Sequence, residues 1–208
     1  MSTKDTKHEP SGISRRGFLK GVGAGAVATG LLQELSESAG IAEAATPKTL
    51  GPGEIPIKLN VNGKSRSLNV EPRVTLLDAL RNRLDVTGAK KVCDRGTCGA
   101  CTVMLDGEVV YSCSVLAVEA QAKKIVTVEG LGTPDNLSDM QAAFIEHDAS
   151  QCGFCTPGFI VDTTAFVRDN PGATLDEVRA GLGGNLCRCG TYAGITAATF
   201  ELAQKGGA

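Results

Sequence analysis

Residues 93–101 read CDRGTCGAC, and this short cysteine-rich loop decides how the rest of the chain is interpreted. A fourth cysteine, Cys113, follows after eleven intervening residues, and we expect it to arrive from a strand beyond a hairpin. A C-x4-C-x2-C run with a distant fourth cysteine is the spacing of plant-type 2Fe–2S sites, in which four thiolates converge on two irons. The small residues between the cysteines allow backbone N–H groups to approach the sulfur atoms. Gly99, directly after a cysteine, is where we expect the closest approach.

Three other interpretations of this loop fit less well. Structural zinc prefers two C-x2–4-C pairs, each holding one side of a tetrahedron, and the five-residue offset from Cys93 to Cys98 fits that pattern poorly. Disulfides suit an exported protein, but cysteines so close together in a glycine-rich loop make awkward bridges. Ordinary buried cysteines would not cluster. We therefore predict a cluster site with the ligands Cys93, Cys98, Cys101 and Cys113.

The remaining cysteines form a second set of four. Cys152 and Cys155 make a C-x2-C pair, and Cys187 and Cys189 follow after a gap of thirty-one residues. By itself this set is compatible with a cluster, a zinc site or a redox dithiol. Residues 152–155, CGFC, look like a thioredoxin motif, but that motif opens the helix of a βαβ unit, whereas its surroundings here are helical. Beside a first cluster, we predict a second 2Fe–2S site.

The coarse pattern predicts two units, and hence an α+β fold. Apolar residues alternate over 55–61, Asn62-Gly63 is a hairpin turn, and a return strand passes through Leu68 and Val70. A helix with an apolar face precedes the cysteine loop, and further strands follow it. Hairpin, helix, loop and closing strands indicate an N-terminal β-grasp domain of the plant-type ferredoxin kind over 55–130. The further elements are the helix face Leu76, Leu77, Leu80 and Leu84, and the strands 102–105, 109–112 and 124–128.

From residue 131 the pattern becomes helical. A helix that begins near Pro157 and runs to about Arg168 is ended by residues 170–172, NPG. Thr174-x-x-Glu177 is a capping box that begins the next helix. With helices at 137–149 and 192–204, the region 131–208 is predicted to be an all-α four-helix bundle that carries its cysteine pairs at helix junctions.

The first forty-four residues have the order of an export signal. Residues 14–20, SRRGFLK, are followed by a mildly apolar stretch, 21–32, and then by the small-residue site Ala42-Glu43-Ala44. Adjacent arginines before Phe-Leu-Lys indicate the twin-arginine type, which exports folded proteins. We expect residues 1–44 to be this leader, residues 45–54 to be a linker, and the mature protein to lie in the periplasm.

Composition excludes several classes of function. The net charge is −2 and no basic stripe stands out, which argues against nucleic-acid binding. No apolar run is long enough for a transmembrane helix. The sequence has no Ser-His-Asp set, no Gly-x-Gly-x-x-Gly and no P-loop, so we predict no catalytic residue. His147, near a helix end, is interpreted as a surface residue or a partner of the helix dipole, and the pairs Lys90-Lys91 and Lys123-Lys124 as solvated charges.

Three long motifs resemble one family. Residues 93–103, 151–158 and 184–192 are similar to the cluster signatures of the molybdenum hydroxylases, the xanthine oxidase family. Residues 130–137 and 140–145, together with the leader, resemble the iron–sulfur subunit of bacterial periplasmic aldehyde oxidoreductases. Small chains of isoquinoline-type and nicotinate-type dehydrogenases share the core motifs. The alternatives outside that family are a free-standing ferredoxin-like carrier and a secreted module held by zinc or disulfides.

The resemblance implies a division of labour. Cys152, Cys155, Cys187 and Cys189 would hold a cluster near a molybdopterin-type cofactor carried by a large partner subunit. Residues that match Gln151 and Cys189 would contact the pterin. The first cysteine set would hold the outer cluster, and would pass electrons to a FAD-binding subunit or a cytochrome. The chain itself would carry electrons without performing the substrate chemistry.

Overall fold

The computed structural model describes residues 49–206. The predicted leader, residues 1–44, lies outside the described residues, and so does the first part of the predicted linker, residues 45–54. From Thr49 to Glu54 the chain is exposed and forms neither helix nor strand. The described residues belong to one compact unit.

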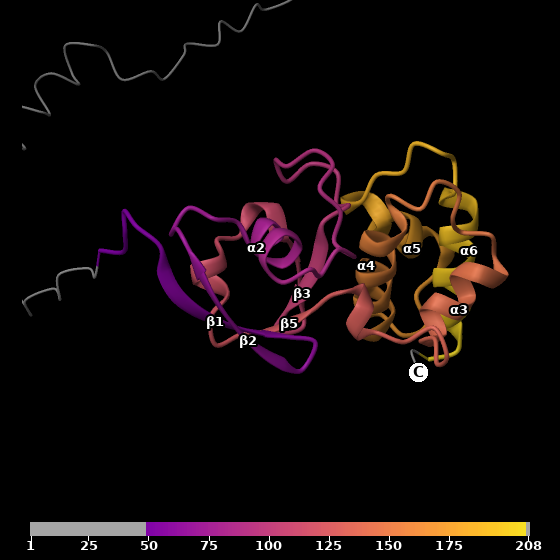
Figure 1. Cartoon of the computed structure of the whole chain (residues 1–208). Helices are drawn as coiled ribbons and strands as arrows, with labels where there is room; N and C mark the ends of the chain where they lie inside the picture. Colours follow the sequence, from indigo (N-terminus) through magenta and orange to yellow (C-terminus); the bar gives the residue numbers. More distant parts are fainter. Residues whose placement is uncertain (1–48, 207–208) are drawn as a thin grey trace, which may run out of the picture. The chain divides into compact units, whose positions relative to one another are not determined.

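A five-stranded mixed sheet forms the first half of this unit (Figure 1). Strands β1 and β2 make the predicted hairpin, because Asn62 and Gly63 both have the positive φ that a type I′ turn needs, 51° and 73°. Strand β5 returns between the two hairpins, parallel to β1 and antiparallel to β3. The sheet order is β2-β1-β5-β3-β4, with β1 Ile55–Val61, β2 Lys64–Val70, β3 Thr102–Leu105, β4 Glu108–Tyr111 and β5 Lys124–Val126.

Helix α2, Leu76–Arg83, packs on this sheet. It begins after Thr75, whose hydroxyl oxygen accepts a hydrogen bond of 3.2 Å from the Asp78 N–H and so satisfies one of the free donors of the first turn. Its apolar face is fully buried, and Leu84 closes the helix as its C-cap. Leu76, Leu77 and Leu80 share one core with Leu59, Val70, Val103 and Ile125, so the loop that follows α2 starts from a rigid base.

The second half is helical, as predicted, with short 3₁₀ helices at several junctions. The capping box of Thr174 and Glu177 is present and begins α5. Helix α3 is shorter than the predicted 137–149 at both ends: a second capping box, Ser138 with Gln141, fixes its start, and the positive φ of Asp148, 49°, lies just beyond its end. The α-helices are α3 Asp139–Glu146, α4 Thr156–Asp169, α5 Leu175–Gly181 and α6 Tyr192–Gln204; the 3₁₀ helices are η1 Ser112–Ser114, η2 Ala117–Ala120, η3 Val128–Gly130 and η4 Leu182–Gly184.

Sheet and helices are joined by direct packing. Each has its own apolar core, and a small third core of Met104, Val161 and Ala165 lies between β3 and α4. At the edge of this contact the Arg168 guanidinium donates to the carbonyl of Gly107, at 3.0 Å, in the turn between β3 and β4. No helix between Thr49 and Gly206 is long and apolar enough to cross a membrane.

Candidate metal centres

The first cysteine loop is wound tightly by residues in the left-handed region of φ. Asp94, Gly96 and Gly99 have φ of 55°, 68° and 69°. This winding points backbone donors at sulfur: the Gly96 N–H donates to Cys113 Sγ at 3.2 Å, and the Thr97 N–H donates to Cys93 Sγ at 3.4 Å. Backbone N–H groups directed at thiolates are the hydrogen bonds that tune a cluster's potential.

The fourth cysteine of this set lies in a different element from the one predicted. The sequence suggested that Cys113 arrives on a strand, but β4 ends at Tyr111 and Cys113 is buried in η1. The short helix turns the chain back so that the sulfur faces the loop. The Ser112 hydroxyl holds this turn by donating to the Cys101 carbonyl at 2.7 Å.

In both sets the thiols lie close enough to affect one another's pKa. Cys98 acts on the pKa of Cys93 and Cys113 on that of Cys101; in the second set, Cys189 and Cys187 act on the pKa of Cys152, and Cys187 and Cys152 on that of Cys155. All eight are free thiols. Within residues 49–206 no three metal-ligating side chains surround a single ion position. Four thiols in each set match the number that a binuclear cluster takes, two on each iron.

Each set combines a thiol that ionises readily with one that does not. The N–H groups of Arg95 and then Thr97 lower the pKa of Cys93 to about 6. Burial raises the pKa of Cys187, but hydrogen bonds with Thr191, Cys189 and Cys155 together outweigh it and bring the pKa to about 6. Burial raises the pKa of Cys101 to about 11 and that of Cys155 to about 12. A bound metal deprotonates coordinating thiols, so the buried members fit a metal-bound state.

The second set is assembled at the junctions of α3, α4 and α6. Cys155 is the N-cap of α4, and Cys152 is exposed just before it. Around Cys187 the contacts are dense: its N–H donates to the Tyr192 hydroxyl at 2.9 Å, and its sulfur lies 2.9 Å from the Thr191 hydroxyl. The Cys189 N–H donates to Cys187 Sγ at 3.3 Å. The fit to a 2Fe–2S cluster therefore holds in both halves of the chain.

Two of the predicted cofactor-binding residues have clear surroundings. Gln151 is exposed beside Cys152, and its contact with a pterin stays a prediction. Gly99 is buried, and a Cβ there would lie 1.5 Å from Asn185 Oδ1 and 2.9 Å from the Asn185 Cα. The closest approach at Gly99 is therefore to the segment that carries Cys187, a contact that no local sequence signal indicates.

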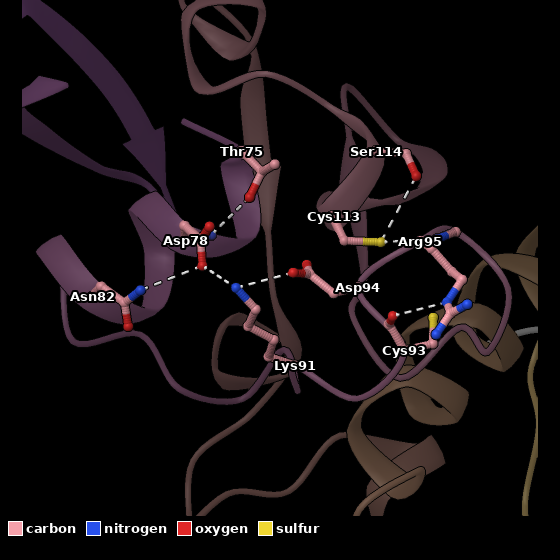
Figure 2. Close-up of polar contacts among 10 residues, drawn as sticks. Thr75, Asp78, Asn82, Lys91, Cys93, Asp94, Arg95, Cys113 and Ser114 are labelled. Carbon is pink, nitrogen blue, oxygen red and sulfur yellow. Dashed lines mark hydrogen bonds and ion pairs between the residues drawn. The ribbon is translucent and has the colours of Figure 1, made fainter. Parts of the chain in front are cut away.

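Lys91, which was predicted to be a solvated surface charge, has two acidic partners near the loop. Figure 2 shows it between α2 and the cysteine loop, with its ammonium 2.9 Å from Asp78 and 3.1 Å from Asp94. Hydrogen bonds to Asp78 and Asp94 raise the pKa of Lys91. It is therefore more than a solvated charge, since it ties the loop to the helix before it. His147 caps α3 as expected, and its Nε2 lies 2.6 Å from Glu201 on α6.

Two family models cover most of the described chain. Residues 59–127 match the 2Fe-2S iron-sulfur cluster binding domain, and residues 127–200 match the 2Fe-2S binding domain. The chain belongs to the two-cluster iron–sulfur subunits of the molybdenum hydroxylases. Its fold is the predicted α+β pair of domains, and its role is that of a non-catalytic electron-transfer subunit with two 2Fe–2S clusters.

The individual relatives agree with this assignment. The chain is 45% identical to the aldehyde oxidoreductase iron-sulfur-binding subunit PaoA of Escherichia coli (strain K12), over 96% of this chain and 93% of that one. It is 45% identical to the nicotine 6-hydroxylase small subunit of Paenarthrobacter nicotinovorans, over 71% and 88%. The crystal structure of quinoline 2-oxidoreductase from Pseudomonas putida 86 matches with a TM-score of 0.69 and 42% identity, over 74% of this chain and 99% of that chain.

Proposed function

We propose that this chain passes electrons from a large molybdenum-cofactor subunit that oxidises an aldehyde to a FAD-binding subunit or a cytochrome. When bound, 2Fe–2S clusters accept and release single electrons. The chain's own residues hold the two sets of thiolates, shield them and fix their separation. The observation that carries the proposal is the direct contact between the sets: the Leu186 N–H, next to Cys187, donates to the Cys98 carbonyl at 3.0 Å.

We assign the second cysteine set to the side of the molybdenum subunit. Cys152 is exposed there, and two large apolar side chains of the same cysteine segments are exposed as well: Phe154 is 60% exposed and Leu186, next to Cys187, is 52% exposed. Exposed apolar side chains gathered at one place mark contact surfaces for partners. Gln151 lies on the same exposed loop, where a pterin-bearing subunit could reach it.

An aldehyde is the substrate class that the relatives favour. The match to the aldehyde oxidoreductase subunit covers 96% of the chain, whereas the match to the nicotine 6-hydroxylase small subunit covers 71%. The second candidate is therefore the small subunit of a dehydrogenase for nitrogen heterocycles. Anaerobic mixing of the purified complex with an aromatic aldehyde or with nicotinate separates the two. We expect the cluster absorption to bleach with the aldehyde, and bleaching with nicotinate alone would favour the second candidate.

Export to the periplasm is part of the same proposal. It is supported by residues 14–20, SRRGFLK. It is also supported by the match to the PaoA subunit, which covers 96% of this chain and therefore includes most of residues 1–44. Cell fractionation tests it with the double substitution Arg15→Lys and Arg16→Lys. The native chain should reach the periplasm and the variant should stay in the cytoplasm. Equal distribution of both would refute the export route.

Affinity purification of the native chain tests its assembly. A large molybdenum-containing partner should co-elute, and the reduced complex should give two 2Fe–2S signals in electron paramagnetic resonance (EPR). Cys187→Ser should abolish one of the two signals, while Ser114→Ala, beside the buried Cys113, serves as the control that keeps both. A chain that elutes alone with both clusters would instead be a free-standing carrier.

A further inference from the structure

Both segments that carry the second cysteine set converge on the backbone of residues 98–100. The first turn of α4 approaches through Gly158, where an added Cβ would lie 2.3 Å from the Gly99 carbonyl oxygen. The other segment approaches through Leu186, whose N–H donates to the Cys98 carbonyl. Cys98 belongs to one ligand set and Cys187 follows Leu186, so a single hydrogen bond separates the two sets along this path.

The side chain of Leu186 is half exposed and does not hold this contact. The preceding residue, Asn185, holds it instead. Asn185 is 3% exposed and its side chain fills the space that Gly99 leaves. Its neighbours Gly183 and Gly184 provide no side chain to anchor the segment. Two tyrosine hydroxyls also hold the segment: that of Tyr111 donates to the Gly184 carbonyl at 2.6 Å, and that of Tyr192 donates to the Asn185 carbonyl at 3.3 Å.

A buried contact links Asn185 to the first cysteine loop. The Thr102 hydroxyl donates to the Gly99 carbonyl oxygen at 2.6 Å and lies 3.2 Å from Asn185 Oδ1. Asn185 Nδ2 is buried and has no hydrogen-bond partner within the described residues. A relay of contacts therefore runs from Asn185 Oδ1 through Thr102 to the Gly99 carbonyl.

We propose that Asn185 is a positioning residue that holds the Leu186–Cys98 hydrogen bond, and that this bond is the electron route between the two ligand sets. The inference rests on the proposed function. In this step one electron moves along the backbone from the Cys187 side to the Cys98 side, and no bond forms or breaks. A buried amide whose nitrogen has no partner costs stability, so its presence at this junction points to a role in alignment.

The test uses the assembled complex with Asn185→Ala, and with Thr102→Val beside the conservative Thr102→Ser. Arg168→Met is the matched control, because it removes a hydrogen bond between sheet and helices far from this relay. Three properties are measured: the EPR signals of both reduced clusters with the magnetic splitting between them, the electron-transfer rate between the clusters after flash reduction, and hydrogen exchange at the Leu186 amide.

We expect Asn185→Ala and Thr102→Val to keep both EPR signals, to weaken the splitting and to slow transfer several-fold. Exchange at Leu186 should become about fivefold faster, as the loss of one typical hydrogen bond implies. Thr102→Ser and Arg168→Met should match the native complex. Unchanged splitting and rate in both disruptive variants would overturn the proposal. Loss of a cluster in both would also overturn it, because Asn185 would then build the site rather than align it.

Failure of the proposed function has a different signature. In that case the native complex, with its two EPR signals intact, would not deliver electrons from an aldehyde to any acceptor. The variants would then show no substrate-driven electron transfer to compare. If only the role of Asn185 is wrong, turnover of the native complex is unaffected.

Discussion

Substitution of Gly158 by alanine measures how closely α4 must approach the first cysteine loop. In an ordinary helix interior this change stabilises by about 1 kcal/mol, because glycine is the poorer helix former. Here the new Cβ would lie 2.3 Å from the Gly99 carbonyl oxygen and 3.2 Å from the Ala100 Cα. These are backbone atoms, and they are held by hydrogen bonds from Thr102 N–H and Lys90 N–H, at 3.0 and 2.9 Å.

The overlap therefore cannot be relieved by rotation of a side chain. Overpacking costs about 1–3 kcal/mol, and we place this case near the upper end because rigid backbone must move. After subtraction of the helix-propensity gain, the net loss is about 1–2 kcal/mol, or about 2–8 °C in Tm for a chain of this size. The first cluster's EPR signal should also broaden, since Gly99 and Ala100 lie between two of its ligands.

Thermal unfolding of the cluster-loaded protein, followed by visible absorption and circular dichroism, gives the measurement. Gly183→Ala is the control, because no atom lies within 4 Å of an added Cβ there and its φ is not in the left-handed region. We expect that control to unfold like the native protein. A Gly158→Ala protein as stable as the native one would refute the close approach of α4 to the loop.

Three further changes have defined outcomes. Burial raises the pKa of Asp162 to about 6, so ionisation of this carboxyl costs stability. The native protein should lose up to about 3 kcal/mol of unfolding free energy as the pH rises from near 4 through 6. In urea titrations, Asp162→Asn should lack that loss at pH 7 and should match the native protein at pH 4. Lys91→Met, which leaves Asp78 and Asp94 without their cation, should lower the unfolding free energy by about 1 kcal/mol or less, and less still in high salt. Ser138→Ala removes the N-cap of α3 and should cost about 1 kcal/mol in the same assay; no change would mean that the cap is not needed.

Local signals predicted most of the fold. The Asn62-Gly63 turn and the Thr174 capping box both act within four residues, so the sequence alone identifies them and the structure confirms both. Ser138 with Gln141 is the same kind of signal and starts α3 two residues later than predicted, whereas the end of α3 at Glu146 has no such marker in the sequence. The position of Cys113 in a 3₁₀ turn has no comparable local signature, since three residues give too short a pattern to distinguish it from a strand end.

The two cysteine sets could be predicted from the sequence for a chemical reason. The contact that joins the two sets could not. Ligand spacing within a loop is a local property that reflects how thiolates reach one cluster. The contact of Asn185 with Gly99 and Thr102 joins residues more than eighty positions apart, and depends on how sheet and helices pack. Lys91 is an intermediate case: its partner Asp94 is close in sequence, but its partner Asp78 is brought near only by the fold of α2.

Strand β5 has a consequence for the order in which the protein acquires its shape. It contains three residues, yet it is the only strand that joins the β1–β2 hairpin to the β3–β4 hairpin within the described sheet. Both hairpins are complete in a nascent chain that ends before Lys124, but nothing then lies between them. The sheet should therefore form slowly and only after β5 has been synthesised, because pairing strands that are far apart in the chain carries a large entropic cost. Synthesis past that point, rather than formation of the cysteine loop itself, would set when a cluster can be received.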